Sequence, residues 1–416
     1  MCSEATRPSE NNRMHALLVS AGTYGNMLPF LGLGKALRAR GHEVTLIGSG
    51  YCRKLAQRED LGFVDVDDPE DRHDMKPGET SPGKWRFLRI LKNRALRQMP
   101  RIYRFLADRY VPGQTVVAAP GWLFGARLAQ EKLGLPLATI QLQPLLFPRV
   151  HGGTRWGLRL LNKLIDRAMD RRLRPSIDAF RAEIGLPPLA QPIRGWWSSP
   201  ERIIGFFPEW YSPAKPDWPS QTLLAGFPLY DVMADGDADA DIKEYLAGGE
   251  PPLVFSQASQ VKHARHYFAA SIEVARLLGR RAVFLTAHRE QLPPSLPPSV
   301  RHFDFIPLST LLPHAAAIVH HGGIGTIAQA LAAGVPQLTV PGMLDQFDNS
   351  RRLLRLGVSS NLRWTPYRPR KVARLLSGLL NSPEVRQNCH DYAVRCRADQ
   401  PFEKACIALE HLHKTR

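Results

Sequence analysis

Residues 319–349 constrain this chain more than any other stretch, because they combine a glycine-rich turn with a helix and a polar second half. The short apolar run 315–319 predicts a buried strand leading into the turn. Gly322, Gly323 and Gly325 then let the backbone turn tightly and approach another molecule closely. The sequence therefore predicts a ligand site at this turn.

The segment after the turn is expected to be a helix that opens at Thr326. The first amide N–H groups of a helix have no partner within it, and together with the helix dipole they favour an anion. His320, His321 and the hydroxyl of Thr326 add further hydrogen-bond donors. This combination suits a diphosphate.

The second half of the motif indicates a different kind of contact. Gly334 ends the helix, residues 335–340 form an apolar strand, and a polar loop with Asp345, Gln346 and Asn349 follows. Side chains with paired acceptors and amide groups suit sugar hydroxyls. The other interpretation is a plain glycine turn between structural elements, with ordinary polar residues on the surface.

The order His-His-Gly-Gly-x-Gly-Thr and then Asp-Gln-x-x-Asn resembles the donor signature of GT-B glycosyltransferases, which use nucleoside-diphosphate sugars. The resemblance implies that the diphosphate and the sugar are held by two separate sets of residues. The diphosphate set is His321, Gly323, Gly325 and Thr326, and the sugar set is Asp345 and Gln346. No carboxylate cluster calls for magnesium or manganese, so we expect no metal and no cofactor besides the donor, a dTDP- or UDP-sugar.

Two further segments match this family. Phe305-Ile306-Pro307 lies where relatives contact the nucleobase, which implies that the Phe305 ring stacks on the base and the Ile306 backbone reads its edge. Alternatively, Phe305 is a core residue that closes a strand. Ser259 matches a serine near the diphosphate, although Ala258 replaces the usual glycine before it.

Strands and helices alternate in both halves of the chain, which predicts an α/β fold. Residues 15–20, 29–40 and 44–47 read as the strand, helix and strand that open a doubly wound parallel sheet. Residues 116–142 repeat this order, and it restarts at Pro252. The first loop lacks the Gly-x-Gly-x-x-Gly pattern, which disfavours an NAD enzyme.

A chain of 416 residues exceeds what one core usually holds, so we expect two Rossmann-like domains, which in the GT-B family face a cleft. In that family the first domain binds the acceptor, the second binds the donor, and the last helix crosses back. The expected division is a loose tail over 1–13, an acceptor-binding domain over 14–231, an acidic linker over 232–251, a sugar-nucleotide-binding domain over 252–398 and a returning helix over 399–416.

The net charge of +17 is the outlier of the composition, and it is concentrated at residues 84–110 and 155–181. Apolar residues recur at helical spacing among the arginines there, which suggests contact with an anionic membrane surface. The alternative is that the apolar sides face the core and the arginines are solvated. No recognition motif for nucleic acid accompanies the charge, so nucleic acid is disfavoured.

The compartment is expected to be the cytoplasm, with peripheral contact to the inner face of the membrane as the second option. No stretch approaches the roughly 18 apolar residues of a spanning helix, and residues 1–13 lack the apolar core of a signal peptide. The five cysteines show neither metal-ligand spacing nor an even disulfide framework.

Inverting glycosyl transfer needs a base for the acceptor as well as stabilisation of the departing diphosphate. The resemblance implies a histidine or aspartate base where this chain has Asn26, and an amide cannot accept a proton. Three explanations stay open. The acceptor arrives already ionised, or Asn26 only orients it and turnover is slow or absent, or the base is one of Asp68, Asp71, His73 and Asp74.

From Met14 onward the order of features is similar to the rhamnosyltransferases of rhamnolipid synthesis, for example at residues 125–132, 226–229 and 331–337. This implies an inverting transfer of a hexose or deoxyhexose, such as rhamnose or glucose, to a hydrophobic acceptor. Hydroxy fatty acids and phenolic natural products are the acceptor classes expected, because macrolide, sterol and phenolic glucosyltransferases share most of these motifs. A catalytically silent sugar-nucleotide-binding partner and a sugar-nucleotide epimerase are the alternatives.

Overall fold

The computed structural model describes residues 13–67, 91–147, 156–231, 237–257, 265–342, 344–362 and 367–415. For residues 156–163, 165, 237–240 and 344 it describes the backbone only. The chain forms two compact units. Within the described residues, the first unit holds 13–67, 91–230 and 400–415, and the second holds 231–399.

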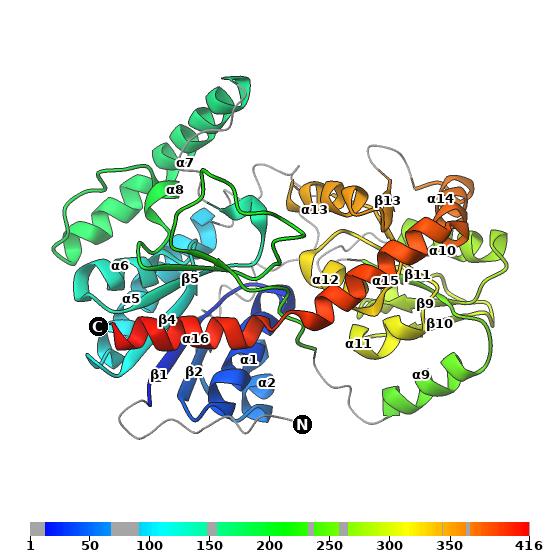
Figure 1. Cartoon of the computed structure of the whole chain (residues 1–416), viewed down its shortest axis with the longest axis horizontal. Helices are drawn as coiled ribbons and strands as arrows, with labels where there is room; N and C mark the ends of the chain where they lie inside the picture. The colour runs from blue at the N-terminus through cyan, green and yellow to red at the C-terminus, as the bar shows by residue number, and fades with distance from the viewer. Residues whose placement is uncertain are drawn as a thin grey trace. The chain divides into compact units, whose positions relative to one another are not determined.

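The first unit is built on a parallel sheet with the strand order β3-β2-β1-β4-β5-β6-β7 (Figure 1). Its strands are β1 (His15–Val19), β2 (Glu43–Gly48), β3 (Gly62–Asp65), β4 (Thr115–Pro120), β5 (Leu137–Gln141), β6 (Arg202–Gly205) and β7 (Thr222–Leu224). All residues of β4 and β5 are buried, as expected for parallel strands that are covered on both faces.

Helices cover both faces of this sheet. They are α1 (Tyr24–Ala39), α2 (Arg53–Arg58), α5 (Leu96–Arg109), α6 (Phe124–Leu133), α7 (Trp156–Glu183), α8 (Ile193–Trp196) and α16 (Pro401–Lys414), with η2 (Gly50–Cys52), the π-helical turn η3 (Leu91–Ala95) and η4 (Pro144–Leu146) between them. One face carries α1 and α16, whose Phe30 and Leu409 share a core with Leu18 of β1. The other carries α5 and α6, whose Ile102 and Ala126 pack with β4.

The second unit repeats this design with the strand order β10-β9-β8-β11-β12-β13. Its strands are β8 (Leu253–Ser256), β9 (Ala282–Leu285), β10 (Val300–Phe303), β11 (Ala317–His320), β12 (Gln337–Thr339) and β13 (Ser359–Asn361). Its helices are α9 (Asp237–Ala247), α10 (Arg265–Leu277), α11 (Leu308–Leu311), α12 (Ile324–Ala333), α13 (Leu344–Arg355), α14 (Pro369–Asn381) and α15 (Pro383–Ala398), with the turns η5 (Arg289–Gln291) and η6 (Leu312–His314).

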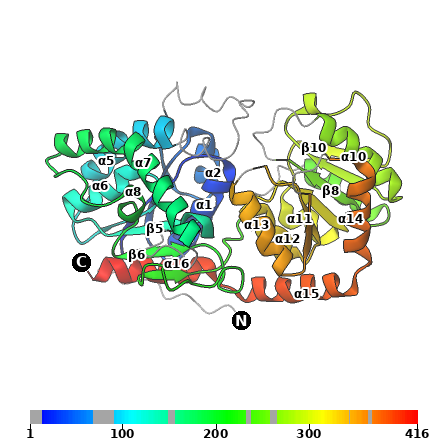
Figure 2. The same ribbon diagram turned by 90° about the horizontal axis from the view of Figure 1, so that it is seen from above.

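Helices again lie on both faces of the second sheet (Figure 2). Phe268 of α10 and Leu376 of α14 fill the core on one face, and Leu311 of α11 and Ala330 of α12 fill it on the other. In both sheets the strand order reverses beside the first strand, between β1 and β4 and between β8 and β11. The predicted α/β fold with two Rossmann-like parallel sheets is confirmed. Such sheets bind ligands at the carboxyl ends of the strands where the order reverses.

The segment 232–251, predicted as an acidic linker, contains helix α9. Ile242, Tyr245 and Leu246 recur at helical spacing on α9, and Ile242 is fully buried against the second sheet. The Tyr245 hydroxyl donates to the carbonyl oxygen of Ala282 at 3.1 Å. The many aspartate and alanine residues made the segment resemble a linker, so the prediction missed a helix that belongs to the second unit.

The basic helices α5 and α7 turn their apolar sides inward. The buried positions are Met99, Ile102 and Leu106 on α5 and Met169, Leu173 and Ile177 on α7. In the described part of both helices, the arginines therefore surround an apolar stripe that already packs in the core. None of the helices in the described ranges is long and apolar enough to cross a membrane.

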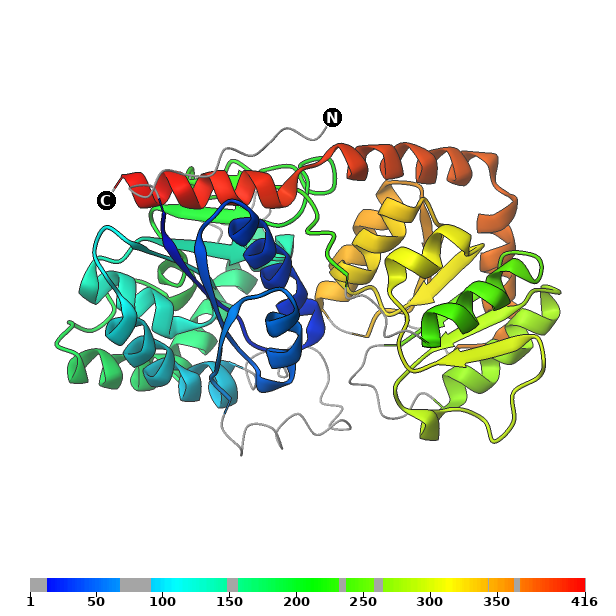
Figure 3. The same cartoon turned by 90° about the horizontal axis from the view of Figure 1, so that it is seen from below.

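The last helix, α16, packs on the first unit beside α1 (Figures 1 and 3). The carboxylate of Glu410 accepts from the guanidinium of Arg40 at 2.6 and 2.8 Å and from Nε2 of His42 at 2.9 Å. Burial works to raise the pKa of Glu410, but the hydrogen bonds from Arg40 and His42 outweigh it, so this pKa lies below its ordinary value.

We expect Glu410→Gln to lower the free energy of unfolding by about 2 kcal/mol at pH 7, because bonds to a charged partner are lost. A depressed carboxylate pKa contributes stability above the unfolded value of about 4.3, and this contribution disappears as the pH falls through the folded value. Denaturant melts should therefore show a gap between wild type and variant that closes below about pH 4. Glu403→Gln, an exposed change on the same helix, should shift stability by less than about 0.5 kcal/mol. A gap that is the same at pH 3 and pH 7 would contradict this account.

Candidate active site

The glycine turn lies at the carboxyl end of β11, beside the point where the strand order of the second sheet reverses. β11 ends at His320, and Gly322 adopts a φ of +89°, which side chains rarely tolerate. Gly323 is the N-cap of α12, which begins at Ile324, two residues earlier than predicted. The predicted strand, turn and helix are thus present at the edge where this fold binds ligands.

Among the residues that the structure describes, no side chain caps the N-terminus of α12. Gly323 offers no side chain to it, and the amide N–H groups of Ile324, Gly325 and Thr326 precede the first intrahelical bond, which Ile327 makes to Gly323. A Cβ added at Gly325 would meet no atom of the described residues within 4 Å, so there is free space beside Gly325 in the first turn. Such an end attracts an anion.

The ring of His321 lies against this helix end. A Cβ added at Gly323 would lie 2.4 Å from Nε2 of His321, so only glycine fits beneath the ring. Nδ1 of His321 is buried and has no hydrogen-bond partner among the described residues. Burial lowers the pKa of His321 to about 4, so the ring is neutral at pH 7. A neutral imidazole donates one hydrogen bond and accepts another.

His320 does not take part in the way the sequence predicted. Its ring is 0% exposed and points into the unit, where it contacts Gln337 and the backbone of Gly322. Side chains alternate between the two faces of a strand, so neighbouring histidines at a strand end turn to opposite sides. Of the two histidines, His321 is therefore the one whose ring lies at the turn.

Asp345 and Gln346 lie in the first turn of α13, where the sequence predicted a loop. An acidic residue in a first turn suits the helix dipole, and the polar composition hid the helix. The Gln346 side-chain oxygen accepts from the amide of Gly342 at 2.8 Å, and Asn349 donates to the carbonyl of Gly322 at 3.1 Å. The start of α13 is therefore joined to the glycine turn.

Phe305 is 52% exposed, so the interpretation as a core residue is wrong. Phe303 instead fills the core at the end of β10, and the Ile306 side chain is buried. The exposed ring of Phe305 thus lies two residues after the end of β10 and directly before the buried side chain of Ile306. Ser259 and its neighbour Ala258 lie outside the described residues.

In the first unit, Asn26 lies in the first turn of α1, because that helix begins at Tyr24 and not at Pro29. Pro29 sits in the second turn, so the preference of proline for a first turn placed the start too late. The Asn26 amide donates to the Ala21 carbonyl at 3.4 Å, and a Cβ added at Gly22 would lie 2.3 Å from its nitrogen. The Asn26 side chain therefore stabilises the turn after β1. Asp68, Asp71, His73 and Asp74 lie outside the described residues.

Comparison with known proteins decides the family. Residues 16–151 match the glycosyltransferase family 28 N-terminal domain, and residues 273–407 match the C-terminal domain of erythromycin biosynthesis protein CIII-like proteins. The chain is 30% identical to the O-mycaminosyltylonolide 6-deoxyallosyltransferase of Streptomyces fradiae over 97% of its own length and 98% of that protein. It is a GT-B glycosyltransferase.

Other glycosyltransferases are similar to this chain in sequence or in fold. The elloramycin glycosyltransferase ElmGT of Streptomyces olivaceus is 28% identical over 83% of the chain and 85% of that protein. The solved kitacinnamycin glycosyltransferase has a TM-score of 0.73 at 18% identity, covering 96% of this chain and 99% of its own. VinC, solved in complex with dTDP, has a TM-score of 0.70 at 18% identity, covering 97% and 100%.

Two clusters of side chains at the carboxyl edge of the glycosyltransferase's first sheet were not predicted from the sequence. Tyr24 and Tyr51 are both exposed and meet edge to face, with ring centroids 4.9 Å apart. Asp67, just after β3, accepts from Arg94 and from Gln98, each at 2.9 Å. The alternating segment 62–67, which ends in aspartate, is the signal that could have found the second cluster.

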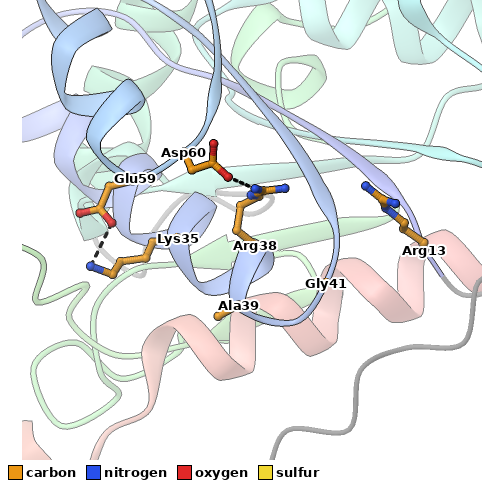
Figure 4. A pocket seen from close by; sticks show the side chains of 7 residues that line it. All are labelled: Arg13, Lys35, Arg38, Ala39, Gly41, Glu59 and Asp60. Carbon is orange, nitrogen blue, oxygen red and sulfur yellow. Dashed lines mark hydrogen bonds and ion pairs between the residues drawn. The ribbon is translucent and has the colours of Figure 1, made fainter.

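A hollow of about 620 Å³ lies elsewhere in the first unit (Figure 4). Arg13, Gly41 and Glu59 on its wall precede β1, β2 and β3, so it opens at the amino ends of the strands. Lys35 and Arg38 on the wall already pair with the carboxylates of Glu59 and Asp60. This hollow lies at the opposite edge of the sheet from the expected ligand site. Among the residues described, no three His, Cys, Asp or Glu side chains gather in a way that could hold a metal ion.

Proposed function

We propose that this glycosyltransferase transfers a hexose or deoxyhexose, with inversion and without a metal, from a dTDP- or UDP-sugar to a hydroxyl of a hydrophobic acceptor. The observation that carries the proposal is the uncapped N-terminus of α12 with the ring of His321 against Gly323. The names of two relatives support a deoxyhexose donor, namely a 6-deoxyallosyltransferase and the aclacinomycin-T 2-deoxy-L-fucose transferase of Streptomyces galilaeus.

The departing diphosphate is stabilised by fixed donors in this proposal. The amides of Ile324, Gly325 and Thr326 bind its oxygens, and neutral His321 adds one hydrogen bond. Donors that are already in position need no reorganisation when negative charge develops, which is why they accelerate the reaction. Ser259 supports the diphosphate, and Asp345 and Gln346 at the start of α13 bind the hydroxyls of the sugar.

The acceptor belongs to the first unit in this proposal. Asn26 cannot accept a proton, and its amide braces the turn after β1, so it orients the acceptor hydroxyl. The base then comes from the segment after β3, where Asp68, Asp71, His73 and Asp74 are the candidates. An acceptor that arrives ionised, such as an acidic phenol, would need no base.

The nucleobase stacks on Phe305 in this proposal. Replacing Phe305 with alanine should weaken the binding of dTDP and UDP about tenfold, because stacking of a base on an aromatic ring contributes roughly 1–3 kcal/mol. Phe305→Tyr keeps a flat ring and should bind within about threefold of wild type. Isothermal titration calorimetry measures both. If the alanine variant bound like wild type, the base would have to lie elsewhere.

A mass-spectrometric screen tests the function. Several sugar nucleotides are incubated with hydroxy fatty acids, phenols and macrolide aglycones, and both glycosylated product and free nucleoside diphosphate are measured. We expect release of nucleoside diphosphate that depends on the acceptor. Binding without release would indicate a silent partner protein, and conversion of the donor without an acceptor would indicate an epimerase.

A further inference from the structure

We propose that His320 is a positioning residue: its neutral imidazole, protonated on Nε2, holds the glycine turn in the shape that receives the diphosphate. This inference rests on the proposed function, because the turn is the proposed diphosphate site. It concerns a residue that does not touch the donor itself.

The two nitrogens of His320 have separate partners, and these determine the tautomer. The amide N–H of Gly322 donates to Nδ1 at 3.1 Å, so Nδ1 carries no proton. The proton therefore lies on Nε2, which donates to the side-chain oxygen of Gln337 at 3.0 Å. Gln337 opens β12, so the imidazole joins the backbone of the turn to the neighbouring strand.

Gly322 is held from both sides. Its N–H is taken by His320, and its carbonyl oxygen accepts from the Asn349 side chain of α13 at 3.1 Å. His320 and Asn349 are buried, and Gly322 lies in the turn itself with the positive φ that makes the turn possible. Because Gly322 separates His321 from Gly323, its orientation sets where the His321 ring and the end of α12 lie.

The neutral state of His320 is required by this geometry. A second proton would sit on Nδ1 and face the N–H of Gly322, so two donors would oppose each other. Burial, together with the neighbouring His321, lowers the pKa of His320 to about 3. The link to Gly322 is consequently intact over the whole range in which the enzyme would work.

Two polar substitutions separate the two hydrogen bonds. The side-chain oxygen of asparagine in His320→Asn can reach the place of Nδ1 and accept from Gly322, but it is too short to reach Gln337. The longer side chain of His320→Gln reaches Gln337 and leaves the Gly322 N–H without a partner. A buried N–H left unpaired costs about 1–3 kcal/mol.

We expect His320→Asn to bind dTDP within about threefold of wild type and His320→Gln to bind at least about tenfold more weakly. Both variants should lose some thermal stability, so melting temperatures alone would not distinguish them. If the two variants bound dTDP equally well, or if His320→Gln bound better, the positioning role would be refuted.

A readout without ligand keeps this inference separate from the proposed function. In the wild-type protein labelled with ¹⁵N-histidine, NMR should show His320 with the proton on Nε2 and no titration between pH 5 and pH 8. A proton on Nδ1, or titration in this range, would overturn the inference. If the wild-type protein bound no nucleoside diphosphate, the proposed function would fail. The NMR measurement of the His320 tautomer would still test the hydrogen bond to Gly322.

Discussion

Replacing His321 with alanine should lower the turnover of the glycosyltransferase about 100- to 1000-fold, which is the usual effect of removing one positioned donor from a developing negative charge. The reason is local: the ring lies over Gly323 at the uncapped end of α12, and its buried Nδ1 has no protein partner among the described residues. Alanine removes this group and leaves the amides of α12 in place, so residual activity is expected.

Steady-state rates with the donor and acceptor found by the screen measure this effect. His390→Ala is the matched control, because it removes an exposed histidine from α15 in the same unit. It should leave turnover within about twofold of wild type, as expected of a surface change away from the site. Equal rates for His321→Ala and wild type, at unchanged donor affinity, would remove His321 from the mechanism.

Replacing Glu131 with alanine should lower the free energy of unfolding by about 3 kcal/mol, since it removes the partly exposed carboxylate that pairs with the buried guanidinium of Arg181. The guanidinium of Arg181 is 2% exposed and donates to both carboxylate oxygens of Glu131 at 2.8 Å. The indole of Trp196 donates to the same carboxylate at 2.8 Å. The variant would leave the Arg181 charge buried without its counterion, and the contacts among α6, α7 and α8 would weaken.

Glu183→Ala provides the comparison for this prediction. Glu183 also pairs with an arginine, Arg104, at 2.9 Å, but both side chains are more than half exposed. Exposed pairs contribute about 0–1 kcal/mol, so this change should be nearly neutral. In denaturant unfolding, Glu131→Ala should lose several times more free energy of unfolding than Glu183→Ala. Similar losses for the two variants would show that the burial of Arg181 does not matter.

The predictions from sequence were most accurate where local sequence patterns and tertiary structure favour the same conformation. Gly322 and Gly323 allow a tight turn, and the short apolar run before them favours a strand, so β11, the turn and α12 were predicted. The assignment of the diphosphate to this turn stays a prediction.

The errors arose where burial decides and composition misleads. Ile242 of α9 packs in the core of the second unit, although the composition of the segment is typical of a polar linker. His320 and His321 are identical residues in sequence, yet the pleat of β11 turns one ring to Gln337 and the other to the helix end. Helical spacing and strand alternation allow such arrangements, but which side of a segment is buried depends on contacts with segments distant in sequence.

A crystal structure of the protein with dTDP tests the central claim most directly. We predict that oxygens of the diphosphate lie about 3 Å from the amide nitrogens of Ile324, Gly325 and Thr326 and from a ring nitrogen of His321. Density for the diphosphate at any other place on the second unit, with this helix end in contact only with solvent, would contradict the account.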